Sequence, residues 1–173
     1  MNQDNEKPTS RGLLVSVIAV SLLGLVSAVY LSQLHWAVHN LPGHVSFCAI
    51  SERLNCDTVS VSSYSSILGV PVSTWGVLYY LSLIVVSLWA FFSKRSSFPW
   101  ALLGAATAGA LVATALLFMI SQLVIRAFCI MCMSLYLVNI VTGFFSVFGL
   151  RRVGTSFTGS AAVLVAAVGS GML

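Results

Sequence analysis

The chain has 173 residues, of which 58% are hydrophobic and only 7% are charged. Several apolar runs reach the length of about 20 residues that crosses a bilayer, which excludes a water-soluble domain and predicts an all-α integral membrane protein. The net charge of +4 does not indicate a nucleic-acid partner, because the basic residues lie in pairs at the ends of the apolar runs rather than in one patch.

The first part of the chain predicts a tail, one transmembrane span and a long loop. Residues 1–11 form a polar N-terminal tail, and the span from Leu13 to Leu34 is too long for a signal peptide and lacks a cleavage-type ending, so we expect it to be retained. Residues 35–70 are mostly polar and form the predicted loop. Its Ser-rich stretch, residues 60–69, is predicted to form a short interfacial helix that Gly69 stops.

Three further spans follow, and with the first they predict a four-helix transmembrane bundle over residues 12–150. They are predicted to cover about Pro71–Phe92, about Pro99–Ile120 and about Ala127–Gly149. Residues 151–173 are interpreted as a short linker and the start of a fifth transmembrane helix. Because this last apolar run stops short of spanning length, we hypothesise that the natural chain continues past Leu173.

The distribution of Lys and Arg predicts the orientation. A cytoplasmic N-terminus places six basic residues inside, namely Lys7, Arg11, Lys94, Arg95, Arg151 and Arg152, and two outside, Arg53 and Arg126. This excess follows the positive-inside rule. The loop 35–70 and the start of the fourth span then face the extracytoplasmic side of a plasma (inner) membrane. All four cysteines therefore meet on one face, which in a bacterial-type chain is the oxidising, periplasmic side.

The C-x-x-C at Cys129 and Cys132 indicates redox chemistry. Residues three apart share one helix face within reach of a disulfide, and the first turn of a helix favours the thiolate that exchanges disulfides. Arg126 could add to this effect, although an arginine in such a position is more often a plain snorkelling anchor. Tyr136 lies one turn deeper on the same stripe as Cys132, where an interfacial aromatic is the alternative interpretation.

Cys48 and Cys56 are eight residues apart in the polar loop, and their spacing leaves several interpretations open. They could form a static disulfide, or two mobile thiols that exchange with a third partner. A zinc site built from all four cysteines is a weaker alternative, because structural zinc ligands usually come as two short-spaced pairs. In a relay, the loop pair would collect electrons outside and pass them to the helix pair, whose apolar surroundings would admit a quinone.

The stretch N-C-D-T-V-S-V-S-S-Y-S-S-I-L-G-V-P-V-S-T-W-G, followed by F-C-I-M-C, resembles the vitamin K epoxide reductase family in its bacterial form. The resemblance covers about Cys48 to Tyr136 and includes the helix count. It implies a four-helix bundle around a quinone, either ubiquinone or menaquinone (vitamin K), without a metal. It also implies a partner that supplies electrons, a thioredoxin-like or DsbA-like thiol oxidase, acting in trans or as a fused domain beyond a fifth span.

The resemblance implies a role for each matching residue. Cys132 would face the quinone and Cys129 would exchange with Cys56, whereas Cys48 would pair with Cys56 and receive electrons from the partner. Ser62 matches a loop serine near the active site, although helix capping explains a serine equally well. Tyr136 matches a tyrosine that hydrogen-bonds a quinone oxygen. Four aromatic residues could line the quinone pocket or serve plain packing: Trp75, Tyr79, Phe118 and Phe128.

One departure from the family limits the substrate. Animal members carry an asparagine that contacts the vitamin near the start of the second span, where this chain has Val72. We therefore expect plain quinone reduction, in support of disulfide bond formation, with epoxide reduction as the alternative. A transporter would need more polar or charged residues within its spans than Gln33 and Asn139. A structural membrane protein with disulfides stays open, and would tolerate the loss of the helix cysteines.

Overall fold

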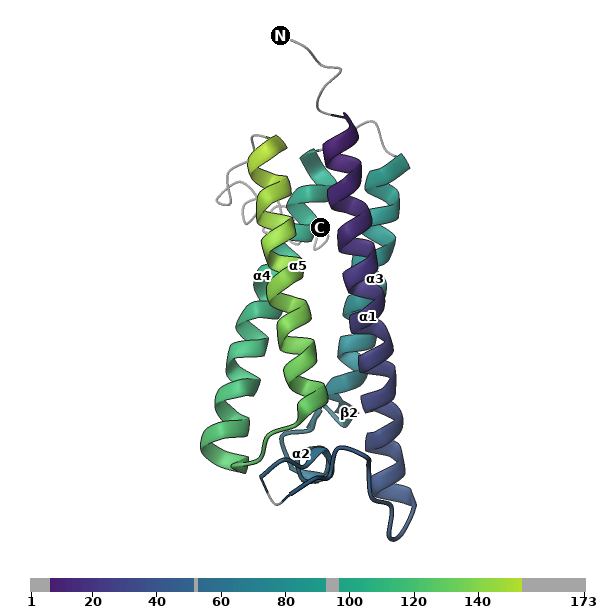
Figure 1. Cartoon of the computed structure of the whole chain (residues 1–173), viewed down its shortest axis with the longest axis vertical. Helices are drawn as coiled ribbons and strands as arrows, with labels where there is room; N and C mark the ends of the chain where they lie inside the picture. Colours follow the sequence, from purple (N-terminus) through teal and green to yellow (C-terminus); the bar gives the residue numbers. More distant parts are fainter. Residues whose placement is uncertain (1–6, 52, 93–96, 154–173) are drawn as a thin grey trace, which may run out of the picture.

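The computed structural model describes residues 7–51, 53–92 and 97–153. It contains the four predicted long helices: α1 (Lys7–Asn40), α3 (Val72–Phe92), α4 (Ser97–Ile120) and α5 (Ile130–Val153). Each is long and apolar enough to cross a membrane. They lie side by side as a bundle (Figure 1), which confirms the predicted fold. The predicted fifth helix falls in residues 154–173, outside the described residues.

Helix α1 continues past the predicted end of the first span. It runs to Asn40 rather than ending near Leu34, so the start of the expected loop is helical. Leu34 and Val38 explain the extension, because both pack onto the apolar cluster that contains the cysteines. The Asn40 side chain also donates to the Trp36 carbonyl one turn earlier, at 2.8 Å. A helix that leaves the hydrocarbon continues where tertiary packing still supports it.

The predicted interfacial helix at residues 60–69 is wrong in position. The short helix α2 instead covers Cys56–Val61, and a two-stranded hairpin follows, β1 (Ser66–Ile67) and β2 (Val70–Pro71). Leu68 and Gly69 form the hairpin turn, with φ of 55° and 77°. Two consecutive positive φ values are typical of a two-residue hairpin turn, so the glycine serves the turn and does not stop a helix.

The connection between α4 and α5 also differs from the prediction. A π-helix, η1 (Ser121–Ile125), extends α4, and Arg126 then takes a left-handed conformation with φ of 57°. Residues 127–129 are not helical, so α5 begins at Ile130 rather than near Ala127. Cys129 consequently lies directly before the helix and Cys132 lies in its first turn.

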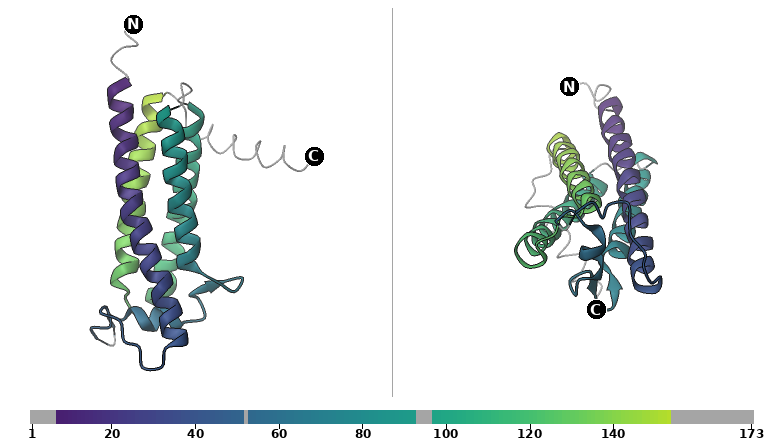
Figure 2. Two further views of the ribbon diagram at one scale, coloured as in Figure 1. Left: turned by 90° about the vertical axis from the view of Figure 1, so that its right-hand side faces the viewer. Right: turned by 60° about the horizontal axis from the view of Figure 1, so that its bottom comes forward.

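The bundle has two apolar clusters, one toward each end. One includes Trp100, Leu103 and Leu150, near the start of α4 and the end of α5. The other contains Leu31 and Leu34 of α1 together with three of the cysteines. Helix α1 packs along α3 and α5, and α4 packs along α5, whereas α3 and α4 touch less. Figure 2 shows α2 and the hairpin gathered at the cysteine end of the four helices.

Candidate active site

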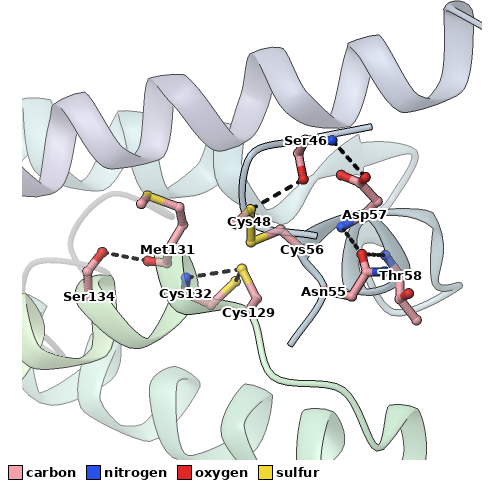
Figure 3. The surroundings of a disulfide bond; sticks show 10 residues. All are labelled: Ser46, Cys48, Asn55, Cys56, Asp57, Thr58, Cys129, Met131, Cys132 and Ser134. Carbon is pink, nitrogen blue, oxygen red and sulfur yellow. Dashed lines mark hydrogen bonds between the residues drawn. A yellow bond between two sulfur atoms is a disulfide. The ribbon is translucent and has the colours of Figure 1, made fainter. Parts of the chain in front are cut away.

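All four cysteines meet in one place. Cys48 and Cys56 form a disulfide, and Cys129 and Cys132 are free thiols. Cys48, Cys56 and Cys129 are almost fully buried in one cluster, against which Cys132 also packs. Figure 3 shows Cys129 pointing from the start of α5 toward the disulfide. The structure therefore brings together the loop pair and the helix pair, which are about 70 residues apart in the sequence.

Side-chain hydrogen bonds hold the disulfide loop in place. Asn55 caps α2, since its Oδ1 accepts hydrogen bonds from the N–H groups of Asp57 and Thr58 at 2.9 and 3.1 Å. Asp57 Oδ2 in turn accepts a hydrogen bond from the Ser46 N–H at 2.9 Å. The Ser46 hydroxyl lies 3.4 Å from Cys48 Sγ. These contacts tie the chain before Cys48 to the helix that begins with Cys56.

A backbone bridge joins the loop to the segment before α5. Leu54 and Phe128 form a parallel β-bridge. The Phe128 N–H donates to the Arg53 carbonyl at 2.6 Å, and the Asn55 N–H donates to the Phe128 carbonyl at 3.0 Å. Cys56 follows Leu54 by two residues and Cys129 follows Phe128 by one. The bridge thus sets the register between the loop cysteine and the helix cysteine that meet in the cluster.

Cys129 occupies the N-cap position of α5. Its Sγ accepts a hydrogen bond from the Cys132 N–H at 3.2 Å and one from the Cys132 thiol, with 2.7 Å between the sulfurs. The Cys132 thiol lowers the pKa of Cys129 most, and burial opposes it. The N–H groups of Cys132 and Met131 lower this pKa further, while the Asp57 carboxylate raises it, and the net direction is down. The lowered pKa makes the Cys129 thiol easier to deprotonate than an ordinary cysteine, and the thiolate is the form that exchanges disulfides.

Ser62 and Arg126 are the two residues predicted to support the cysteine site. Ser62 ends α2, where its hydroxyl donates to the Val59 carbonyl at 2.7 Å, and it also lines the cavity described below. Its capping contact is thus present, and its role beside the active site stays a prediction. Arg126 is exposed at the turn between η1 and the bridge. Its influence on the thiolate also stays a prediction.

A cavity of about 430 Å³ lies beside the cysteines, within the range of small-molecule sites. Cys132 and Tyr136 of α5 line it, as do Trp75 and Tyr79 of α3. Small residues of α4 form another wall, namely Ala105, Ala106, Gly109, Ala110 and Ala113. The wall is mostly apolar, which suits the ring and tail of a quinone.

The other two predicted aromatics lie near the cavity without being part of its lining. Phe118 meets the ring of Tyr136 edge-on, with 6.1 Å between the ring centroids. Phe128 belongs to the backbone bridge and is 37% exposed. Their contribution to quinone binding therefore stays a prediction. Phe118 could influence the quinone only by positioning the ring of Tyr136, which it contacts.

A polar chain across the cavity wall was not predicted from the sequence. The Tyr80 hydroxyl donates to Asn139 Oδ1 at 2.8 Å, and Asn139 Nδ2 donates to Thr114 Oγ1 at 2.8 Å. All three residues line the cavity, and they join α3, α5 and α4. Asn139 could have indicated this chain in the sequence, because an amide within an apolar span needs hydrogen-bond partners inside the bundle.

The cysteine arrangement does not fit a zinc site. The Cys48–Cys56 disulfide removes two of the four thiolates that a closed tetrahedral site needs. Among residues 7–51, 53–92 and 97–153, no group of three or more His, Cys, Asp or Glu side chains could hold a metal ion. The four sulfurs are instead arranged as one disulfide packed against one free pair, which suits thiol–disulfide exchange.

Comparison with protein families agrees with this chemistry. The family model described as the vitamin K epoxide reductase (VKOR) family matches residues 15–147. The chain belongs to the vitamin K epoxide reductase family. No curated protein matches the chain well enough to count as a relative.

Membership of the VKOR family settles the general class of activity. Enzymes of this family are thiol-dependent quinone reductases, so the chain is a multi-pass membrane oxidoreductase whose acceptor is a quinone. The cavity suits a quinone, because Cys132 and four tyrosines, among them Tyr79 and Tyr136, line one mostly apolar space. Val72 also lines the cavity and offers no side-chain hydrogen-bond donor.

Proposed function

We propose that this VKOR family enzyme takes electrons from a thioredoxin-like or DsbA-like protein on the periplasmic side and passes them to ubiquinone or menaquinone. In doing so it supports disulfide bond formation in exported proteins. The observation that carries the proposal is the Cys48–Cys56 disulfide packed against the Cys129–Cys132 pair, with Cys132 on the wall of a quinone-sized cavity. The partner acts in trans or as a fused domain.

The relay runs through two disulfide exchanges before the quinone is reduced. A thiolate of the reduced partner attacks Cys48, and Cys56 leaves as a thiolate. The second partner thiol then resolves the mixed disulfide at Cys48, which releases the oxidised partner. Cys56 next attacks Cys129 of the oxidised helix pair, and Cys132 leaves. Cys48 attacks Cys56 to restore the loop disulfide and releases Cys129, so the helix pair now holds the two electrons.

The last step consumes the reduced helix pair. Two electrons and two protons pass to the quinone, which becomes a hydroquinone, and Cys129 and Cys132 close to a disulfide. The direction of the relay follows the reduction potentials, because about 30 mV corresponds to about 1.4 kcal/mol for a two-electron couple. A quinone of higher potential therefore draws electrons from the thiols.

Access to Cys48 requires a movement of the loop. Cys48 is only 1% exposed, so a partner protein reaches it when the segment held by the Ser46–Asp57 hydrogen bond opens. The side chains that flank this segment, Val45, Phe47 and Ile50, are all more than 60% exposed. They give the loop an apolar outer surface around a buried sulfur.

The orientation and the quinone substrate each have support from the sequence. The excess of Lys and Arg at the end opposite the cysteines supports a cytoplasmic N-terminus and a periplasmic active site. Val72 supports simple quinone reduction over epoxide reduction, because it offers no side-chain donor at the position where the resemblance places the asparagine of the animal enzymes.

The test is dithiol-driven reduction of a ubiquinone or menaquinone analogue by the purified protein in detergent. We expect turnover by the wild type and none by Cys132→Ser, since the serine cannot form the closing disulfide. Ser134→Ala, two residues along, is the control, because the Ser134 hydroxyl only donates to the Met131 carbonyl of its own helix. Wild-type protein that is folded and still inactive with both quinones would overturn the proposal.

A further inference from the structure

Two neighbouring tyrosines line the cavity and differ in how their hydroxyls are satisfied. The Tyr80 hydroxyl donates to Asn139 Oδ1, and Asn139 continues to Thr114. The Tyr79 hydroxyl is buried and has no hydrogen-bond partner. The two rings contact each other edge-on, with 5.0 Å between the centroids. Two chemically identical side chains therefore share one place, and one of them keeps an unused hydrogen-bonding group.

An unused buried hydroxyl in a helix bundle needs an explanation. Leaving such a group unpaired carries a desolvation penalty that a hydrogen-bonded group or an apolar substitute does not. Ser21, Ser87 and Ser146 also have buried hydroxyls without partners. A serine hydroxyl on a helix reaches its own backbone carbonyls by a change of χ1, and a tyrosine hydroxyl is too far from its backbone to do so. Within the described part of the chain, Tyr79 alone combines an unpaired buried side-chain polar atom with a place in the cavity wall.

Tyr79 lies on the same helix as Val72, the position where animal members of the family are expected to carry an asparagine. Val72 lies seven residues earlier, so the two side chains share one face of the helix. Both line the cavity. A quinone carries two carbonyl oxygens on opposite sides of its ring, and each gains negative charge during reduction, so a quinone site benefits from two donors. Tyr136 of α5 is the candidate donor for one oxygen, and Val72 has nothing to offer the other.

We propose that the Tyr79 hydroxyl donates a hydrogen bond to the second carbonyl oxygen of the quinone, the one that Tyr136 does not bond. This proposal rests on the proposed quinone reduction and makes Tyr79 a catalytic residue of this chain. Tyr80 cannot take the same role without giving up its bond to Asn139. A donor at Tyr79 binds the quinone and also stabilises the charge that develops on its oxygen, so it affects both KM and kcat.

The experiment compares Tyr79→Phe with Tyr80→Phe. Without a quinone, Tyr79→Phe removes an unpaired hydroxyl, so we expect a Tm equal to or above that of the wild type. With menadione as acceptor, we expect its kcat/KM to fall about tenfold or more, since a hydrogen bond in a dry site is lost. Tyr80→Phe leaves Asn139 Oδ1 without its donor, so its Tm should fall. A Tm that falls in Tyr80→Phe and does not fall in Tyr79→Phe separates a structural contact from a ligand contact.

A binding measurement separates failure of this proposal from failure of the proposed function. Trp75 lines the same cavity, so quenching of tryptophan fluorescence by menadione reports binding without turnover. An inactive wild type that binds menadione, with a weaker Kd in Tyr79→Phe, would overturn the relay and support the Tyr79 contact. Unchanged Kd and kcat/KM in Tyr79→Phe, or a lowered Tm without quinone, would overturn the Tyr79 contact and leave the relay intact.

Discussion

The two ends of the bundle are closed in different ways. At the end away from the cysteines, large side chains lie directly against glycines, Trp100 against Gly149 and Leu150 against Gly104. Trp100, Leu103 and Leu150 are each no more than 3% exposed there. At the cysteine end, the helices spread around a cavity of about 430 Å³, and hydrogen bonds, a β-bridge and a disulfide close it.

The packed end therefore stabilises the fold, whereas the cysteine end carries out the reaction. Close packing of large side chains on glycines leaves no room for rearrangement, so it fixes the angles between the helices. The cysteine end needs room for a quinone and for sulfurs that change partners, and its contacts are ones that break and form again. Substitutions at the packed end should therefore change Tm, whereas substitutions at the cysteine end should change turnover.

The largest expected effect is the loss of partner-driven turnover in Cys48→Ser. The partner's thiolate then has no disulfide to attack, so reduction of the quinone with a reduced thioredoxin-like protein should fall to background. A small dithiol reaches the helix pair directly, so turnover with dithiothreitol should continue. Initial rates with the two donors measure this split. Equal loss with both donors would mean that Cys48 acts on the helix pair itself and not on the partner.

Gly149→Ala tests the packed end. The added Cβ would overlap the Trp100 ring, and overpacking of this kind costs about 1–3 kcal/mol. We expect a lower Tm with an unchanged kcat at temperatures where the variant stays folded. Gly12→Ala is the matched control, because its Cβ meets nothing within 4 Å and alanine is the better helix former. Equal Tm values for the two variants would contradict the role given to the packed end.

The four spans were predictable because lipid imposes a simple requirement. Each needs about 20 apolar residues, and the spans predicted to end near Phe92 and Ile120 do end there. The loop offered no such requirement. The hairpin at Leu68 and Gly69 and the bridge between Leu54 and Phe128 depend on backbone hydrogen bonds between segments, which composition does not reveal.

The candidate site was predictable to the extent that its chemistry lies in distinctive residues. Four cysteines and the C-x-x-C spacing indicated the meeting of two redox pairs, and the structure brings all four together. The chain Tyr80–Asn139–Thr114 was missed, because Tyr79 and Tyr80 look alike in sequence. Their difference arises from what α4 and α5 place opposite each ring, which is a property of the packed bundle.

Asn55→Ala tests how the loop presents Cys56. It removes the cap of α2, which costs about 1 kcal/mol, and so loosens the turn that carries the cysteine. We expect a decrease of several-fold in the rate of electron transfer from the loop pair to the helix pair, measured by rapid quenching with a thiol-alkylating reagent. Asn55→Asp keeps an acceptor at the cap and should retain most of the rate. A full rate in Asn55→Ala would show that the β-bridge alone sets the register.

The smallest expected effect concerns the pH at which Cys129 becomes a nucleophile. The Cys132 thiol is the main cause of its lowered pKa, so Cys132→Ser, which keeps a hydroxyl donor, should preserve more of the shift than Cys132→Ala. Both variants leave Cys129 as the free thiol of the helix pair, with the loop disulfide intact. The rate of alkylation of Cys129 by iodoacetamide, followed by mass spectrometry against pH, should reach half its maximum at a higher pH in Cys132→Ala.

The same shift links thiolate formation to stability. A lowered pKa in the folded state means that the unfolded chain binds more protons between the folded and the unfolded pKa of Cys129, so stability rises with pH across that window. The gain is complete above the unfolded pKa and is lost as pH falls through the folded one. Tm should therefore increase with pH more in Cys132→Ser than in Cys132→Ala. Identical slopes would mean that the backbone N–H groups of α5, and not the second thiol, lower the pKa of Cys129.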